Sequence, residues 1–432
     1  MSIALGARLH RVVRRSPPLS STESVILDFE CLYFPLSTYR EERSRLKSGD
    51  EDNMPKISVV MPAYNHASFV GQAVESVLKQ SLDDLELLVY DDASTDETAN
   101  VVRSIKDKRV FLTEHTSNQG ASSAVNAALR RTKGDYIAIL NSDDYFLPGK
   151  LECQAQFLDN NPSFGAVFGW QVFVDERGEA LPDEKNPFRN RLKRHGNHPR
   201  EGWLHHFFTV GNALCQPTVM IRKTCYEDVG VYDPRLAQLA DYDLWIRLCT
   251  RHDIHILPQV VTAYRVLESG GNASAGHANA KRRHDWELQY VFRRYLALSD
   301  EELRRIFATE FAELDPDGRQ LSKVLLGRLA LKLGPSAWAA SAYLAFGLDT
   351  LWQALGESSA DISPSEYAQL TGYYEALAGP SAAGVETDRL RSTIERLEQD
   401  LKALRSSSSW RLTAPMRIFA DGLKSHRRNS RG

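Results

Sequence analysis

The sequence is short of the features that mark exported and membrane-spanning proteins. Its five cysteines have no CxxC spacing and leave one over, which is typical of reduced thiols rather than of a disulfide framework. The first residues are interrupted by arginines and by Pro17 and Pro18, so they contain no apolar core of a secretory signal. The longest uncharged stretch, 333–348, is shorter than the roughly 20 residues that a membrane-spanning helix needs. We therefore expect a cytoplasmic protein, with a packed helix over 333–348.

The overall composition is that of a globular protein. The chain has 432 residues, of which 42% are hydrophobic and 25% charged, and this length predicts two or three structural units. The net charge is only -3, although arginines and lysines are concentrated at both ends. We expect no nucleic-acid partner.

From residue 56 onward, apolar runs alternate with segments of helical periodicity. This alternation predicts an α/β fold with a mainly parallel sheet flanked by helices. In such sheets ligands bind beyond the carboxyl ends of the strands, so the loops after Met61, Tyr90 and Leu140 should share one crevice. The predicted strands are 57–61, 85–90, 110–113 and 136–140, and the predicted helices are 69–80, 95–106 and 121–130.

Each of these three loops carries polar residues at the end of an apolar strand. The first reads Pro-Ala-Tyr-Asn over 62–65, where Asn65 has the alternative role of a helix cap. In the second loop, only one of Asp91 and Asp92 can face the crevice directly. The third holds the adjacent carboxylates Asp143 and Asp144, which repel each other unless a cation intervenes. Oxygen ligands suit Mg²⁺ or Mn²⁺ bound together with substrate phosphates.

The motifs PAYN, DDASTDET and NSDD, at these separations, resemble the family 2 glycosyltransferases with the GT-A nucleotide-diphospho-sugar transferase fold. The resemblance covers roughly 56–270. It implies that Tyr64 stacks on a nucleobase that Asp92 also contacts, and that Asp144 holds a divalent metal on the diphosphate. The motif begins with Asn141, where many relatives have aspartate. The residues expected at the donor are Pro62, Ala63, Tyr64, Asn65, Asp91, Asp92 and Asp143.

A fourth segment, Ala-Asp-Tyr-Asp-Leu-Trp-Ile-Arg over 240–247, resembles the acceptor side of the same family. The resemblance implies that Asp241 is the general base, with Asp243 as a nearby competitor; the alternative is that Asp241 only begins a helix. The family has glutamate where this chain has Ala240, and the preceding segment 216–222 resembles a strand that faces the acceptor. The acceptor-side residues expected are Asn212, Gln216, Asp243 and Trp245.

The resemblance implies an inverting transfer of a sugar from a nucleotide diphosphate donor to a glycan or lipid-linked acceptor in surface polysaccharide synthesis. The Gln-x-x-Arg-Trp motif of processive synthases is absent, so we expect one sugar per visit. Two alternatives remain open. A sugar nucleotidyltransferase should have a glycine-rich basic loop after its first strand, where this chain has PAYN. A non-catalytic scaffold would assemble partners through a coiled coil without turnover.

The flanking regions suggest structural and docking roles. We expect an irregular arm over 1–54, the catalytic domain over 55–275, and a helical accessory region over 280–380 without chemistry. Leucine and isoleucine recur at coiled-coil spacing within 386–405, which predicts self-association. The basic tail 406–432 could contact an anionic membrane surface. Four histidines suggest a polar loop rather than a zinc site: His195, His198, His205 and His206.

Overall fold

The computed structural model describes residues 54–182, 186, 188, 192, 195–267, 278–337, 339–356 and 362–373. The coiled-coil segment 386–405 and the basic tail 406–432 lie outside the described residues, as do residues 1–53 of the predicted arm. The predictions for those segments therefore stay predictions.

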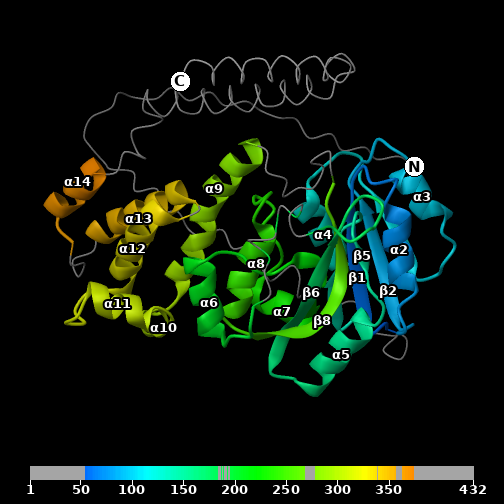
Figure 1. Ribbon diagram of the computed structural model, residues 1–432, viewed down its shortest axis with the longest axis horizontal. Coiled ribbons are helices and arrows are strands. Elements are labelled where there is room, and N and C mark those ends of the chain that lie inside the picture. Colours follow the sequence, from blue (N-terminus) through cyan, green and yellow to red (C-terminus); the bar gives the residue numbers. More distant parts are fainter. Residues whose placement is uncertain are drawn as a thin grey trace, which may run out of the picture. The chain divides into compact units, whose positions relative to one another are not determined.

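One eight-stranded sheet forms the centre of the fold, in the order β3-β2-β1-β4-β7-β6-β8-β5. Figure 1 shows its strands β1 and β2 beside helix α2. The pairs β1–β2, β2–β3, β1–β4 and β6–β8 are parallel, whereas β7 runs antiparallel between β4 and β6. A short β5 pairs antiparallel with the edge of β8. The strands are β1 (Ile57–Ala63), β2 (Leu85–Asp91), β3 (Val110–Glu114), β4 (Tyr136–Ile139), β5 (Tyr145–Phe146), β6 (Phe164–Val174), β7 (Met220–Arg222) and β8 (Asp253–Arg265).

Helices cover both faces of this sheet because its strands carry apolar side chains on both sides. One core packs Val59 and Met61 of β1 against helices α2, α3 and α5, and the other packs Val60 against α4, α6 and α8. These helices are α2 (Val70–Leu78), α3 (Thr98–Ser104), α4 (Ala121–Leu129), α5 (Lys150–Asn160), α6 (Arg200–Thr209), α7 (Lys223–Val229) and α8 (Ala240–Cys249). The predicted α/β class, the mainly parallel sheet and the flanking helices are confirmed.

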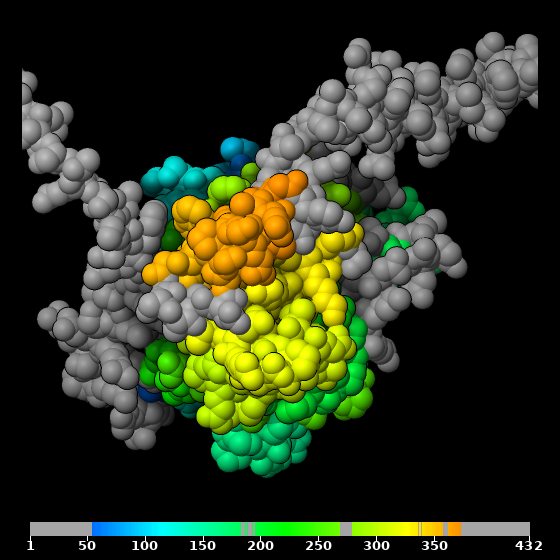
Figure 2. All heavy atoms as spheres, turned by 90° about the vertical axis from the view of Figure 1, so that its left-hand side faces the viewer, coloured from blue at the N-terminus to red at the C-terminus, as the bar shows by residue number. Residues whose placement is uncertain are grey.

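The C-terminal helical region is also confirmed, and it shares a core with the sheet domain. The ring of Phe208 in α6 lies 4.8 Å from Phe292, 5.1 Å from Phe307 and 6.0 Å from Phe346, measured between centroids. The helices of this region gather on the face that Figure 2 shows, where most of their atoms are yellow or orange. They are α9 (Ala278–Phe292), α10 (Asp300–Ile306), α11 (Ala308–Leu314), α12 (Ser322–Leu333), α13 (Ala340–Leu355) and α14 (Pro364–Tyr373), with the short η4 (Arg293–Ala297) after α9.

Two predicted elements are wrong in detail. The expected single helix over 333–348 is instead the end of α12, a short 3₁₀ turn at Gly334–Ser336 and the first half of α13. The turn contains Pro335, which lacks an amide hydrogen and disfavours an unbroken helix. The expected strand over 216–222 begins with a 3₁₀ turn at Gln216–Thr218 and leaves only β7 extended. Among the described residues, no helix combines the length and apolarity that crossing a membrane would require.

Candidate functional site

The first two loops are joined to each other by side-chain hydrogen bonds. The amide of Asn65 donates to Ser94 Oγ at 2.9 Å, and the amide of Thr95 donates to Asn65 Oδ1 at 2.8 Å. Asn65 and Ala93 both have positive φ angles, 52° and 62°, which are unusual for residues other than glycine. Helix α2 starts only at Val70, so the helix-cap alternative for Asn65 does not hold. Asn65 ties the PAYN loop to the DDAS loop.

The third loop is bound to the first at the same edge of the sheet. His66 Nδ1 lies 2.8 Å from Ser142 Oγ, in the NSDD segment. Pro62 and Ala63, the last residues of β1, pair with the last residues of β2. The Tyr64 side chain projects from this edge with 44% of its surface exposed. The three loops therefore form one continuous polar rim, as the parallel strand order predicts.

Asp91 and Asp92 are both buried and hold different parts of the rim. Asp92 accepts hydrogen bonds from the amides of Gln119 at 2.9 Å and Gly120 at 2.7 Å, and His115 Nδ1 lies 2.9 Å from it. Asp91 Oδ1 accepts from the Ser94 amide at 2.8 Å, whereas its Oδ2 is buried without a hydrogen-bond partner. Asp92 thus holds the loop that leads into α4, whereas Asp91 has one carboxylate oxygen, Oδ2, that accepts no hydrogen bond.

Asp144 is almost completely enclosed. Its Oδ1 accepts from the backbone amide of Arg265 at 2.7 Å, and its Oδ2 accepts from Asn141 Nδ2 at 3.0 Å. Burial raises the pKa of Asp144 well above its usual range, and the charge of Asp143 raises it further, although the bonds from Arg265 and Asn141 oppose this. Asp143 is 6% exposed and Asp144 only 1%, so Asp143 is the more accessible carboxylate of the pair.

The Asp143–Asp144 pair fits a divalent cation held partly by a ligand. A cation beside two buried carboxylates would relieve the repulsion that raises the pKa of Asp144. In the part of the chain that the structure describes, no group of three or more His, Cys, Asp or Glu side chains could hold a metal alone. Mg²⁺ and similar ions commonly bind through one or two carboxylates plus substrate phosphates, which matches this arrangement.

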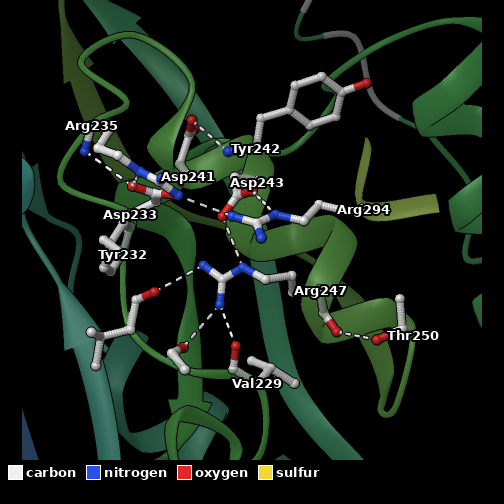
Figure 3. A network of polar contacts seen from close by, with 12 residues as sticks. Val229, Tyr232, Asp233, Arg235, Asp241, Tyr242, Asp243, Arg247, Thr250 and Arg294 are labelled. Carbon is white, nitrogen blue, oxygen red and sulfur yellow. Dashed lines mark hydrogen bonds and ion pairs between the residues drawn. The ribbon is translucent and has the colours of Figure 1, made fainter. Parts of the chain in front are cut away.

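The acceptor side is built around the first turn of α8. Asp241 Oδ2 accepts from Asn212 Nδ2 at 3.3 Å. Its Oδ1 accepts from the Tyr242 amide at 2.7 Å (Figure 3). Burial raises the pKa of the Cys215 thiol, and the negative charges of Asp144 and Asp241 raise it further. Ser122, in the first turn of α4, donates through Oγ to the Leu236 carbonyl at 3.2 Å, and the amide of Gly120 just before α4 binds Asp92. The segment that leads into α8 therefore lies beside the loop that Asp92 holds.

Three of the residues expected to face the acceptor have internal roles instead. Asp243 is completely buried and pairs with Arg247 at 2.8 Å and Arg294 at 2.6 Å (Figure 3). Trp245 is also completely buried, and its ring packs 5.0 Å from that of Phe168. These two expectations are wrong, because a helix that begins at the site turns its fourth and sixth residues into the core. Gln216 donates to the Tyr232 hydroxyl at 3.0 Å and is half-buried.

The histidine cluster is only partly the expected polar loop, because His195 and His198 lie in the loop before α6 whereas the other two lie in the helix. His205 and His206 lie in α6, and the His206 ring is 4.9 Å from His195 and 5.9 Å from Trp203, measured between centroids. Burial lowers the pKa of His206 to about 4, with the neighbouring histidines contributing. His206 therefore packs among aromatic rings and stays uncharged near neutral pH.

Sequence reasoning missed the long-range partners that hold these loops. The guanidinium of Arg265 is buried and donates to the backbone carbonyl of Asp143 at 2.8 Å and to Gln72 Oε1 at 2.6 Å. Its only signal in the sequence is an arginine at the end of an apolar strand. Gly120 is a second residue that sequence reasoning missed. Its amide donates to Asp92 and its φ is 87°, so the glycine itself was the available signal in the sequence.

Comparisons with known proteins agree with this geometry. The family profile described as glycosyl transferase family 2 matches residues 58–221. An uncharacterized glycosyltransferase of Methanocaldococcus jannaschii, MJ1057, is 29% identical over 222 residues, which cover 50% of this chain and 72% of the relative. An uncharacterized glycosyltransferase of Haemophilus influenzae is 43% identical over 131 residues, which cover 30% of this chain and 52% of the relative.

Among solved structures, S. aureus TarS 1–349 in complex with UDP-GlcNAc is similar at a TM-score of 0.47 and 17% identity. The similarity covers 70% of this chain and 92% of that one. The matched family segment begins in β1, ends in β7 and includes all three strand-end loops. Residues 58–221 of this chain are therefore a glycosyltransferase domain of glycosyl transferase family 2.

Proposed function

We propose that this chain is an inverting, non-processive, metal-dependent glycosyltransferase that moves a sugar from a nucleotide diphosphate donor to a glycan or lipid-linked acceptor. The observation that carries the proposal is the joining of three strand-end loops into one rim, with Asp241 on the adjoining first turn of α8. In this arrangement the rim forms the donor side of the site, and the first turn of α8 forms the acceptor side. The family match supports the same class of reaction.

On the donor side, the exposed ring of Tyr64 is suited to stacking on a nucleobase. Asp91 has an open acceptor oxygen for an N–H group of that base, and Asp92 keeps the neighbouring loop in place. Asp143 and Asp144 would hold the divalent metal against the diphosphate. When bound, that metal supplies positive charge to the departing diphosphate.

On the acceptor side, Asp241 takes the proton of the acceptor hydroxyl as its oxygen attacks the anomeric carbon. The bond from that carbon to the diphosphate breaks in the same step, and its electron pair leaves with the nucleoside diphosphate. A single displacement of this kind inverts the anomeric centre. Asn212, which already donates to Asp241 Oδ2, keeps the carboxylate oriented. The product class that we propose is a surface polysaccharide.

A turnover assay tests this function. The full chain is incubated with UDP-, dTDP- and GDP-sugars, with Mn²⁺ or with a chelator, and the release of nucleoside diphosphate is measured. We expect release from one donor class, dependent on Mn²⁺ and lost in Asp144→Asn. Binding of nucleotide without release from any donor, with acceptor glycans present, would instead support the scaffold alternative.

A further inference from the structure

The carboxylate of Glu287, in α9, caps the helix that carries the proposed base. Its side chain is 4% exposed, and Oε1 accepts from the amide of Ala237 at 2.9 Å. Oε2 accepts from the amides of Gln238 at 2.8 Å and Leu239 at 3.0 Å. Leu239 is the N-cap residue of α8 and has no side-chain cap of its own. The amide of Leu239 is one of the four at the start of a helix that have no partner within it, so Glu287 caps α8 from a different helix and also holds the two residues before it.

The capped segment leads directly into the first turn that contains Asp241. The Asp241 carboxylate accepts hydrogen bonds from Asn212 Nδ2 and from the amide of Tyr242, the next residue. Because Asp241 is the second residue of α8, the place of its carboxylate depends on where α8 begins and how its first turn is rotated. The three amides that Glu287 binds set both, because they belong to the residues immediately before the helix.

A second residue of the same region holds the same segment. Arg294, in η4, donates to Asp243 Oδ1 at 2.6 Å and to Asp233 Oδ2 at 3.2 Å (Figure 3). Glu287 and Arg294 are seven residues apart, two helical turns, so they project from one face of α9 and η4. Together they bind the loop before α8 at 233 and 237–239, and the first turn of α8 at 243.

We propose that Glu287 is a positioning residue for the acceptor-side base, and that helix α9 thereby acts on turnover. The proposal rests on the proposed function, in which Asp241 takes the acceptor proton. Misplacing a reacting group by about 1 Å can cost on the order of 10²-fold in rate, so the loss of one buried cap can act on turnover. Donor binding is made by other loops and should be independent of Glu287.

The test compares Glu287→Gln and Glu287→Asp with wild type. The glutamine amide places an NH₂ group against a backbone N–H, so at least one of the three amides loses its acceptor. We expect Glu287→Gln to lower kcat about tenfold, while the Mn²⁺-dependent dissociation constant for the nucleoside diphosphate stays within about twofold. Glu287→Asp keeps the charge on a shorter side chain and should be intermediate.

Ser299→Ala is the matched control. Ser299 is the N-cap of α10 in the same helical region, where it forms a capping box with Glu302. Its loss should lower Tm by about 2–4 °C, as the loss of a helix cap does, with kcat unchanged. If Ser299→Ala lowers kcat as much as Glu287→Gln at equal loss of Tm, Glu287 contributes stability only and the proposal is overturned.

Two further measurements separate this proposal from the proposed function. Hydrogen exchange at the amides of 237–239 should become faster in Glu287→Gln but not in Ser299→Ala, and unchanged exchange would contradict the capping role. If Asp241→Asn abolishes nucleoside diphosphate release whereas Glu287→Gln leaves kcat intact, only the positioning role fails. If wild type releases no nucleoside diphosphate, or Asp241→Asn releases it normally, the proposed function fails instead.

Discussion

The donor side and the acceptor side of this site are held together in different ways. The donor side consists of loops that follow neighbouring parallel strands, and these loops bind one another through Asn65, Ser94, His66 and Ser142. The acceptor side is the first turn of a single helix, α8, and the position of that turn depends on residues from α9 and η4. The donor side is therefore a property of the sheet, whereas the acceptor side is a property of how the C-terminal helices pack on it.

The largest expected effect separates chemistry from binding. Asp241→Asn removes the proposed proton acceptor but keeps the size of the side chain, so turnover should fall by roughly 10²–10⁴, the usual contribution of a general base. Donor binding, made on the other side, should be unchanged. Steady-state release of nucleoside diphosphate measures the first, and unchanged turnover would remove Asp241 from the mechanism.

The buried ion pairs of the acceptor side should matter for stability. Arg294→Met leaves the completely buried Asp243 with Arg247 as its remaining partner, and we expect a loss of about 2 kcal/mol in the free energy of unfolding. Arg305→Met is the control, because Arg305 pairs with the exposed Glu301 and should cost less than about 0.5 kcal/mol. Equal losses in denaturant titrations would show that the two pairs do not differ.

On the donor side, Asp92→Asn should weaken nucleotide binding through the loop before α4. In their shortest hydrogen bonds, Gln119 and Gly120 donate to different carboxylate oxygens of Asp92, and asparagine replaces one of these oxygens with an NH₂ group that cannot accept, so the loop should shift. We expect the dissociation constant for the nucleoside diphosphate to rise about tenfold, equivalent to about 1.4 kcal/mol. Glu287→Gln is a control with the opposite expectation, since it should lower kcat and leave the dissociation constant for the nucleoside diphosphate unchanged. A dissociation constant equal to that of wild type would contradict the role of Asp92.

The smallest effect concerns the backbone of the DDAS loop. Ala93 has a φ of 62°, a conformation that glycine adopts without steric cost. Ala93→Gly should therefore stabilise the protein by up to about 1 kcal/mol, after the larger unfolded-state entropy of glycine is subtracted. The same change at Ala127, inside helix α4, should destabilise by about the same amount. Thermal denaturation tests whether Tm rises in Ala93→Gly and falls in Ala127→Gly.

Much of the donor side could be predicted from the sequence because it depends on local patterns. Apolar runs bounded by polar motifs gave the strands β1 to β4 to within two residues, and the order of parallel strands brought their loops together. The roles inside the loops were less predictable. Whether Asp91 or Asp92 keeps an open acceptor depends on the amides of Gln119 and Gly120, which are almost thirty residues away.

The acceptor side was predicted less well because its determinants are distant in sequence. The position of Asp241 at a helix start follows from its local pattern, but the burial of Asp243 and Trp245 depends on which face of α8 meets the sheet. Glu287 and Arg294 lie in a segment whose leucine-, arginine- and glutamate-rich composition indicates only packed helices. Their contacts span about fifty residues, and no local pattern marks them.

The most direct test of the division between the two sides is a calorimetric titration of UDP, dTDP and GDP, with Mn²⁺ and with a chelator in its place. It is carried out on wild type, Asp143→Asn and Asp241→Asn. We expect one nucleotide to bind wild type and Asp241→Asn within about twofold of each other, and Asp143→Asn to bind at least about tenfold more weakly. Equal weakening in Asp143→Asn and Asp241→Asn, or binding that does not depend on Mn²⁺, would contradict a metal-held donor separate from the base.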